Sequence, residues 1–451
     1  MRAILSPFLL LLLSFAIISQ AGCGAGSSTS SHQVGGAETA LQVSLSDAPA
    51  DQVLSFQLTI NSIVLTSSTG TTAGVLPAAV TVEVSHLQAT AQPVSQLEVA
   101  PGTYTGATVS LSGVTATYVN LSGQIASASF SGTFTVPVSF SPSLVVGTTP
   151  VALNLDLNLA QSIVSLTSSG FTPTMTASAS TVPAASQQEE GNGGVHDLTG
   201  VITSLGSNSF VLAVNQVATA LTIVVDSNTQ FAGVSSFAGL AVGNIVEVNA
   251  AFESNNTLLA SKVEAEVGIQ LEAEGVVVSR TAGSGSAANS FVVAVQDAAG
   301  AGAPLPGTLL TVQADGTTAY ILPSDEASLS GLPFTPAFSS FANLAVGQRV
   351  EVRTTSTFGA VVAQIKLNLQ TLRGTPNSQT GNQYTLTLPA TGDSALQLLT
   401  GVTSIDFILQ SSTELKGLST IVLGTPLHVR GLLLFDSGSG RYKLVASRIT
   451  P

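Results

Sequence analysis

The sequence predicts an all-β protein, built as an N-terminal antiparallel β-sandwich followed by three small OB-like β-barrels. Short apolar segments alternate with polar residues at a period of two, as in Leu153, Leu155 and Leu157, and Gly, Pro, Asn or Ser bounds each segment. That period indicates half-buried strands. No stretch combines a capping box with an apolar stripe of helical period. Four short signatures also recur three times in the same order, which indicates a repeated module.

The first segment, residues 1–22, is predicted to be a lipoprotein signal peptide. A short basic start precedes an apolar run from Ala3 to Ile18, which is shorter than the about 20 residues that span a bilayer. The residues from Gln20 to Cys23 resemble the lipobox of bacterial lipoproteins, although that family usually has Leu where Gln20 stands. The resemblance implies acylation of Cys23. The alternative is ordinary signal cleavage nearby that leaves an unmodified cysteine.

The lipid anchor is favoured because Cys23 is the only cysteine in 451 residues and so has no partner for an internal disulfide. Two or more acyl chains make a stable anchor. Gly24 follows the cysteine, and by resemblance to enterobacterial sorting this implies the outer membrane of a bacterial cell envelope. Residues 23–40, rich in Gly and Ser at their start, are predicted to be a flexible tether.

Composition separates this chain from disordered and nucleic-acid-binding proteins. Hydrophobic residues make up 44% of the chain and charged residues only 8%, so Ser, Thr, Asn and Gln must cover most of the surface. Without Arg2, 11 basic and 25 acidic residues remain, a net charge near −14. Such a chain repels phosphate backbones, so no nucleic acid partner is expected.

Residues 41–181 are predicted to form the sandwich, of the Ig/prealbumin-like kind. Alternating segments such as Leu41 to Leu45 and Phe56 to Ile60 are separated by turn signals at Pro101-Gly102 and Ser169-Gly170, a spacing typical of sandwiches. The residues 182–194 that follow have no apolar periodicity and contain two acids and a glycine cluster. They are interpreted as a linker.

The rest of the chain is predicted to be three barrel repeats, at residues 195–267, 268–369 and 370–451. Each copy has an opening strand glycine, an aromatic residue two positions after an asparagine, a threonine two positions before an apolar residue, and a glycine before a strand that reads Val-Glu-Val or Leu-His-Val. These are Gly200, Gly275 and Gly374; Phe210, Phe291 and Tyr384; Thr229, Thr318 and Thr413; Gly243, Gly347 and Gly424. Five short strands per copy suit a closed barrel without free edges. Insertions at 300–306 and 323–336 lengthen the second copy, and loops absorb such insertions readily.

These motifs resemble two families of domains of unknown function. Residues 41–181 resemble family 4382 through the segments Val43 to Pro49, Val99 to Tyr104 and Leu153 to Leu159. The three repeats resemble family 5666 through the opening glycine, the Thr-x-Phe element and the Val-Glu-Val strand. The third copy departs from this pattern, because His428 stands in place of the acidic residue. The resemblance implies a bacterial envelope lipoprotein and implies no activity.

A calcium site is the first candidate for chemistry. Asn154, Asp156 and Asn158 alternate along one strand face, and with Asp47 they could offer oxygen ligands to Ca²⁺. The favoured interpretation is a solvated outer strand face. Asp47 is expected to cap a turn before Pro49.

Other searches predict no metal, no cofactor and no enzyme. The four histidines, His32, His86, His196 and His428, include no pair at metal-ligand spacing. No Gly-x-Ser-x-Gly or Ser-x-x-Lys motif is present. The glycine-rich segment from Gly300 to Pro304 lacks the lysine and the following helix of a phosphate loop.

The repeated aromatics and acids have two interpretations each. Phe210, Phe291 and Tyr384 could form a stacking platform for a ligand, but their alternation with Val or Leu favours plugs of the barrel cores. Glu247 and Glu351 of the Val-Glu-Val strands are expected to be solvated charges.

The sequence therefore predicts a non-enzymatic, lipid-anchored envelope protein that displays β modules for structural, adhesive or partner-binding roles. Its expected partners are the membrane, through the lipid, and an envelope protein or polysaccharide. The alternatives are a carbohydrate- or small-ligand-capture lipoprotein and an envelope hydrolase, which would need Asp, Glu and Ser brought together in space. A pocket lined by exposed aromatics would favour capture, and barrels filled by their own side chains would favour display.

Overall fold

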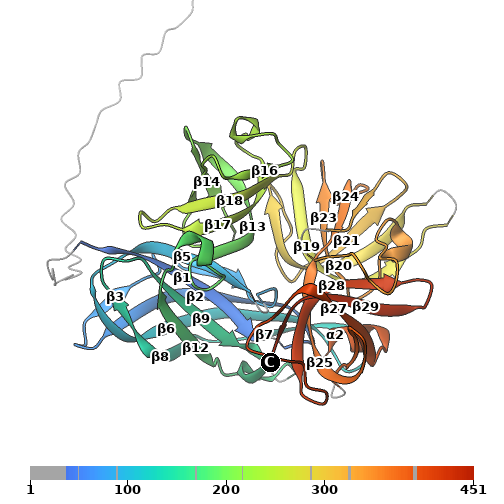
Figure 1. Ribbon diagram of the computed structural model, residues 1–451, viewed down its shortest axis with the longest axis horizontal. Coiled ribbons are helices and arrows are strands. Elements are labelled where there is room, and N and C mark those ends of the chain that lie inside the picture. The colour runs from blue at the N-terminus through green and yellow to red at the C-terminus, as the bar shows by residue number, and fades with distance from the viewer. Residues whose placement is uncertain are drawn as a thin grey trace, which may run out of the picture. The chain divides into compact units, whose positions relative to one another are not determined.

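The computed structural model describes residues 37–48, 50–87, 90–167, 170–215, 217–284, 287–323, 327–389 and 394–451 (Figure 1). The predicted all-β class is confirmed, with 58% strand and 5% helix. The predicted signal peptide, Cys23, most of the tether and His32 lie outside the described residues. Within those residues, no helix is long and apolar enough to cross a membrane.

The N-terminal domain is a sandwich of two sheets that share one apolar core. One sheet has the order β12-β9-β1-β5, and the other has the order β3-β2-β6-β7, with β4 also paired to β2 and β8 to β6. The strands are β1 (Thr39–Ala48), β2 (Val53–Ser67), β3 (Thr72–Gly74), β4 (Val80–Glu83), β5 (Ala91–Val99), β6 (Gly102–Val119), β7 (Ile125–Phe130), β8 (Phe134–Val146), β9 (Val151–Asn158) and β12 (Met175–Thr181). A separate hairpin pairs β10 (Ile163–Ser165) with β11 (Gly170–Phe171).

The period-two alternation places side chains as predicted. Leu153, Leu155 and Leu157 of β9 are fully buried, while the residues between them face the other side of the sheet. One pair departs from the predicted antiparallel arrangement, because β9 runs parallel to β1, with Leu41 opposite Val151. A parallel pair needs a long crossover connection, and here the whole second sheet provides it.

The three repeats have related sheets. The first has the order β15-β14-β13-β17-β18-β16, the second β21-β20-β19-β23-β24-β22, and the third is a closed barrel of the order β25-β26-β27-β29-β28. The strands are β13 (Gly194–Leu205), β14 (Ser209–Ala213), β15 (Leu221–Val224), β16 (Gln230–Ala232), β17 (Ile245–Phe252), β18 (Leu258–Ala265), β19 (Leu271–Thr281), β20 (Asn289–Gly300), β21 (Leu309–Ala314), β22 (Ala319–Ile321), β23 (Arg349–Thr354), β24 (Gln364–Leu367), β25 (Leu369–Thr380), β26 (Gln383–Thr387), β27 (Ser404–Leu415), β28 (Leu427–Asp436) and β29 (Arg441–Thr450). In the third copy, the single strand β27 takes the place of two short strands.

Closure differs between the copies. In the first copy, an additional parallel pairing of β15 with β18 joins the strands into a ring. In the second copy, a single bridge between Gln313 and Val361 takes that place. The closing strand β24 is only four residues long there, too short to form a ladder with β21.

The repeated threonine makes the same two hydrogen bonds in every copy. Its hydroxyl donates to a backbone carbonyl in or beside the closing strand and accepts from the backbone N–H three residues earlier. The donated bonds are Thr229 to Ala260 at 2.8 Å, Thr318 to Val362 at 3.0 Å and Thr413 to Ala446 at 2.7 Å. The accepted bonds come from Asp226 at 3.0 Å, Asp315 at 3.2 Å and Gln410 at 2.8 Å. A hydroxyl is needed because one atom both donates and accepts.

The opening glycine is required by a close approach between strands. A Cβ atom at Gly275 would lie 2.0 Å from the carbonyl oxygen of Ala294. We therefore expect Gly275→Ala to lower the free energy of unfolding by about 1–3 kcal/mol, as overpacking does, measured by chemical denaturation. Gly316→Ala is the control, since no atom lies within 4 Å of a Cβ there. Equal stability of the two variants would contradict this explanation.

The barrel interiors are filled by the repeated aromatics. Phe210 and Phe291 are 1% exposed and Tyr384 is 6% exposed. Tyr384 stacks on Phe407 with ring centroids 4.9 Å apart. The core-plug interpretation is confirmed, and the stacking platform for a ligand is wrong.

Short helices occur where none was predicted. They are α1 (Leu159–Ser162), α2 (Ala395–Thr400) and the 3-10 turns Ala185–Gln187, Phe237–Gly239 and Phe341–Asn343. Ser394 caps the start of α2 by accepting from the Gln397 N–H, and Gly401 ends it with φ of +76°. A helix of under two turns is too short to show a helical period in the sequence.

Candidate functional site

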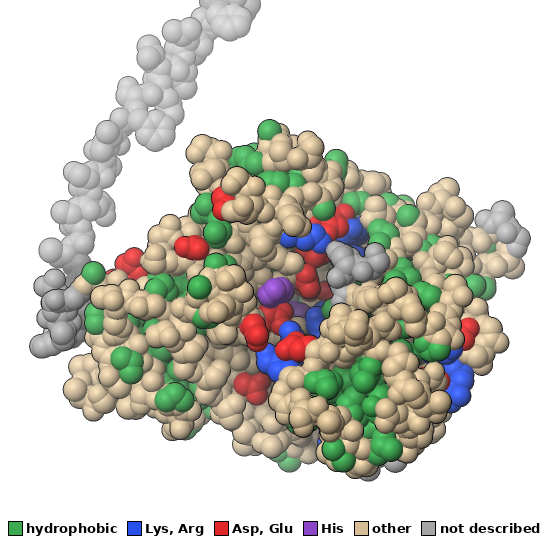
Figure 2. Space-filling model, viewed as in Figure 1, with side chains coloured by type: hydrophobic (Ala, Val, Ile, Leu, Met, Phe, Trp, Pro, Cys, Tyr) green, Lys and Arg blue, Asp and Glu red, His purple; other side chains and the backbone are tan. Residues whose placement is uncertain are grey.

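The candidate site is a polar cleft between the sandwich, the linker and the repeats, which we call the junction cleft. It consists of an inner cavity of about 100 Å³ and an outer cavity of about 330 Å³, and both are lined by Thr90, Ala91 and Glu190. Figure 2 shows acidic, basic and histidine side chains gathered around this hollow, while most of the visible surface is uncharged. Charged side chains of both signs therefore line this cleft.

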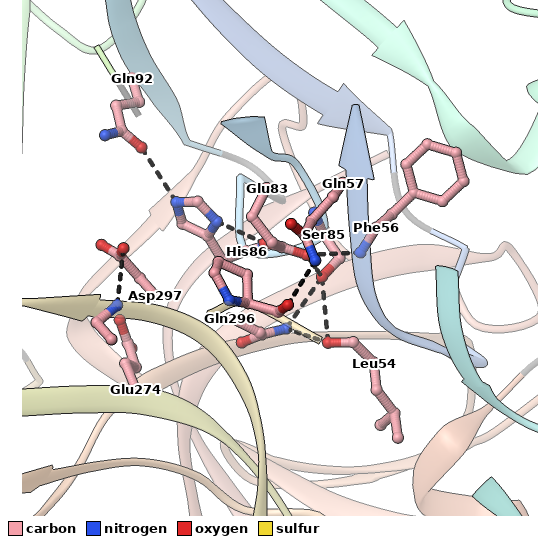
Figure 3. Close-up of polar contacts among 12 residues, drawn as sticks. Leu54, Phe56, Gln57, Glu83, Ser85, His86, Gln92, Glu274, Gln296 and Asp297 are labelled. Atoms are coloured by element: carbon pink, nitrogen blue, oxygen red, sulfur yellow. Dashed lines mark hydrogen bonds and ion pairs between the residues drawn. The ribbon is translucent and has the colours of Figure 1, made fainter. Parts of the chain in front are cut away.

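The sandwich side of the inner cavity carries a buried ion pair. Glu83, at the end of β4, is 1% exposed and accepts hydrogen bonds from the Phe56 N–H at 2.7 Å and from the Ser85 N–H at 3.2 Å. His86 Nδ1 lies 2.7 Å from Glu83 Oε2, and His86 Nε2 lies 3.1 Å from Gln92 Oε1 (Figure 3). Both ring nitrogens face acceptors, which favours the doubly protonated imidazolium. Burial opposes that charge, but the hydrogen bond and the charge of Glu83 outweigh burial and raise the pKa of His86.

The second repeat bonds Ser85, whose hydroxyl donates to Glu83 of this ion pair. Gln296 Nε2, on β20, donates to the Leu54 carbonyl at 2.9 Å and to Ser85 Oγ at 3.2 Å (Figure 3). Gln296 is 5% exposed. A buried amide that bonds the neighbouring domain fixes the two domains in register.

Repeat strands supply two more ion pairs to the inner cavity. Arg349 Nε lies 2.8 Å from Glu274 Oε1, and Lys366 Nζ lies 3.4 Å from Glu247 Oε2. Burial opposes the charge of Glu274, but the Arg349 guanidinium and an Asn368 hydrogen bond lower the pKa of Glu274 overall. Burial raises the pKa of Glu247 to about 8.

A third cluster joins the first and second repeats. Arg353, 3% exposed, lies 2.7 Å from Glu266 and 3.4 Å from Glu272, and it also bonds Glu351. Burial raises the pKa of Glu266 to about 7 and raises that of Glu272 well above its usual range. The three carboxylates therefore share one guanidinium.

The prediction that Glu247 and Glu351 are solvated charges was wrong. Glu351 is 3% exposed, and the Glu247 side chain is 11% exposed. The side chains of Glu247 and Glu351 do lie on the outer faces of their barrels, as expected. Neighbouring modules cover the outer faces of the barrels, so these acids become interior charges that need partners.

Arg430 is different from the other cations of the cleft. It lies on β28, opposite Thr371 and Arg448 of the adjacent strands, and its side chain lines the inner cavity. Within the described residues, its guanidinium makes no hydrogen bond or ion pair. Burial lowers the pKa of Arg430, but an arginine remains protonated in proteins. Glu190 and Asp197, which line the same cavity, act electrostatically on this positive charge, but neither forms an ion pair with Arg430 within the described residues.

The outer cavity has one polar wall from the sandwich. Ser46 Oγ donates to Asp156 Oδ1 at 2.8 Å, and Asn154 Nδ2 donates to Ser46 Oγ at 2.9 Å. The buried Asn154 Oδ1 has no protein partner. Lys416, His428 and Arg448 of the third repeat also line this cavity. Arg448 lies 3.6 Å from Glu190, and Lys416 lies 3.1 Å from Glu189.

Of the calcium ligands considered from the sequence, Asp47, Asn154 and Asp156 line the outer cavity, whereas Asn158 does not. Asn158 instead caps α1 by accepting from the Gln161 N–H at 2.9 Å. Asp47 is 4% exposed and accepts from the Leu159 N–H at 3.3 Å. Burial raises the pKa of Asp47 well above its usual range. Within the described ranges, no three His, Cys, Asp or Glu side chains are placed to hold a metal ion. The face of Asn154 and Asp156 lines the outer cavity instead of lying open to solvent.

No pair of histidines stands at metal-ligand spacing in the sequence, yet His86 and His196 both line the inner cavity. His428 lines the outer cavity, where its Nδ1 lies 3.0 Å from the Pro451 carbonyl oxygen. Sequence reasoning missed Arg349, Lys366 and Arg430 entirely. The only signal was their scarcity, because each cation of a chain with 12 Lys and Arg is a candidate for a specific contact.

Comparisons with known proteins match two segments of the chain to protein families. Residues 38–172 match the family described as domain of unknown function DUF4382, and residues 199–264 match domain of unknown function DUF5666. No curated protein matches. A crystal structure of a multidomain protein with nucleic acid binding domains from Streptococcus pneumoniae TIGR4 is 12% identical, over 56% of this chain and 72% of that chain, with a TM-score of 0.12. A likeness so low carries no argument about this chain.

Proposed function

We propose, for a chain that carries a DUF4382 domain at residues 38–172 and a DUF5666 domain at residues 199–264, a non-enzymatic role in the bacterial cell envelope. The protein is held by an acylated Cys23 in the outer membrane and displays its β modules to an envelope partner. The observation that carries this proposal is the filling of the barrels by their own aromatics, because a barrel without an internal cavity offers its outer surface for binding.

Contacts between modules support display as a fixed array. Gln296 of the second repeat bonds the sandwich at Leu54 and Ser85. The insertion of the second repeat, predicted as a loop, also contacts the sandwich, since the Thr117 hydroxyl donates to the Gly307 carbonyl at 3.2 Å and Gln57 donates to the Pro306 carbonyl. A rigid array loses little conformational entropy when it binds a partner.

Exposed apolar side chains support the same role. Val242 in the first repeat is 60% exposed, and Leu423 at the matching turn of the third repeat is 47% exposed. Each stands immediately before the turn glycine of its copy. Repeated apolar positions on outer turns suit contact with a partner protein.

The anchor is tested with Cys23→Ser. We expect this variant to leave the membrane fraction for the soluble fraction and to keep the far-ultraviolet circular dichroism spectrum of the wild type, because Cys23 lies outside the sandwich and the repeats. Ser28→Ala, in the same predicted tether, is the control and should stay with the membranes. Membrane association of the Cys23→Ser protein would contradict the anchor, and detection of both fractions by immunoblotting decides the outcome.

A second candidate function, capture of a small ligand, is favoured by one observation, the unpaired Arg430 in the junction cleft.

A further inference from the structure

We propose that the junction cleft binds a sugar acid, with the ligand carboxylate on Arg430 and the ligand hydroxyls on the polar wall formed by Ser46, Asn154 and Asp156. This inference depends on neither the lipid anchor nor display to a partner. It assigns a ligand class to a cleft that no family description covers.

Arg430 is the residue proposed to bind the ligand carboxylate. Arg349 is paired with Glu274, Lys366 with Glu247, and Arg448 with Glu190. Arg430 has no such partner within the described residues. A guanidinium presents five N–H donors in a planar fork that matches a carboxylate in two parallel hydrogen bonds. A ligand carboxylate would therefore give a direct partner to a cation that, among the described residues, has only the longer-range charges of Glu190 and Asp197.

The wall of the outer cavity offers hydrogen-bond acceptors to a ligand. Asn154 Oδ1 is a buried acceptor without a protein partner, and Asp156 has acceptor capacity beyond the Ser46 hydrogen bond. Unmatched acceptors select a ligand that donates, and a ligand hydroxyl both donates and accepts. Ser46 Oγ, which already bonds both neighbours, holds the two acceptors in place.

The outer cavity is large enough for a small molecule and adjoins the inner cavity. The outer cavity, at about 330 Å³, lies near the lower end of the about 300–1,000 Å³ typical of small-molecule sites. It shares Glu190, Thr90 and Ala91 with the inner cavity that Arg430 lines. The two cavities therefore adjoin at these residues, and the proposed ligand would extend across them from the arginine to the polar wall.

The lining also explains why the acid group is required. Among the residues that the structure describes, no Phe, Tyr or Trp lines either cavity, so a sugar ring has no aromatic face there to stack on. Binding must come from hydrogen bonds and charge. A neutral sugar would lack the charge-assisted contact with Arg430 and should bind much more weakly.

The experiment measures binding to the mature chain, residues 23–451, by isothermal titration calorimetry and by ligand-observed NMR. The probes are D-glucuronate, D-glucose, acetate and glycine, each at up to millimolar concentration. We expect D-glucuronate to bind and D-glucose to bind at least about tenfold more weakly, because a site built for a polar group rejects the analogue that lacks it. Acetate tests the carboxylate alone, and glycine tests a zwitterion of an amino acid.

The matched variants are Arg430→Gln and Arg441→Gln, since Arg441 is an exposed arginine of the same repeat. Arg430→Gln should abolish D-glucuronate binding, and Arg441→Gln should leave it unchanged. Arg430→Lys, which keeps the charge but loses the fork, should bind at least about tenfold more weakly than wild type. Circular dichroism and the melting temperature verify folding of each variant.

Four outcomes would overturn the proposal. These are no binding of D-glucuronate, unchanged binding by Arg430→Gln, equal binding of D-glucose, and equal or tighter binding of acetate or glycine. The wild-type comparison of probes decides the question even if an Arg430 variant does not fold.

Discussion

Arg353→Met is expected to lower the free energy of unfolding by about 3–5 kcal/mol. Arg353 is 3% exposed and is surrounded by Glu266, Glu272 and Glu351. Removal of the guanidinium leaves these buried carboxyl groups without their cation, whereas Met keeps most of the volume and the packing. Urea denaturation followed by circular dichroism measures the change.

Two further variants separate charge from packing. Lys416→Met removes a cation whose pair with Glu189 is exposed, with side chains 47% and 58% accessible, and should cost less than about 1 kcal/mol. Glu272→Gln should cost less than Arg353→Met, because burial raises the pKa of Glu272 well above its usual range and so disfavours the charge that this substitution removes. An equal loss of stability in Arg353→Met and Lys416→Met would contradict the central role of the buried arginine.

Stability is expected to fall as the pH rises from about 5 to about 9, the reverse of ordinary acid denaturation. Burial raises the pKa of Glu247 to about 8 and that of Glu266 to about 7, above their usual 4.5. The folded state therefore holds these protons more tightly than the unfolded state. The resulting stabilisation is fully present below the unfolded pKa and is lost as the pH passes through the folded pKa. The slope approaches about 1.4 kcal/mol per pH unit for each proton retained.

Other groups add to this trend, act outside the window or, in the case of His428, oppose it, because burial lowers the pKa of His428 and the folded state binds that proton less tightly. Glu83 raises the pKa of His86 through its hydrogen bond and charge, against the effect of burial, so His86 contributes with the same sign. The Arg349 guanidinium lowers the pKa of Glu274 against the opposing effect of burial. The stabilisation that Glu274 contributes is therefore lost only below about pH 4.5, outside this window.

Melting temperatures at pH 5.5, 7 and 8.5 test the direction. Glu247→Gln should flatten the dependence, because the variant has no proton to lose at that position. Glu98→Gln, on an exposed position of β5, should leave the dependence unchanged. A melting temperature that rises across this range would show that the buried acids are ionised throughout.

The fold could be predicted because its determinants are local in the sequence. The alternation of Leu153, Leu155 and Leu157 specifies which face of β9 is buried. The opening glycine and the turn threonine recur because each meets a steric or hydrogen-bonding requirement within its own module, as Gly275 and Thr229 show. Closure was harder to predict, because a bridge such as Gln313 to Val361 depends on strand lengths that insertions change.

The site could not be predicted, because its residues meet only after the modules pack. His86 comes from the sandwich, Arg349 from the second repeat and Arg430 from the third. Glu247 was assigned to solvent on the assumption that each barrel stands alone. Its repetition as Glu351 in a chain with 8% charged residues was the signal that these acids have partners.

The parallel pairing of β9 with β1 has a consequence for the order of folding. β1 lies between β5 and β9, and its partner residue for Leu41 is Val151. Although β1 can pair with β5 earlier, its sheet is complete only after β9 and β12, among the last strands of the domain, have been made. Contacts so distant along the chain slow folding, so the newly made chain spends longer unfolded before this sheet is complete.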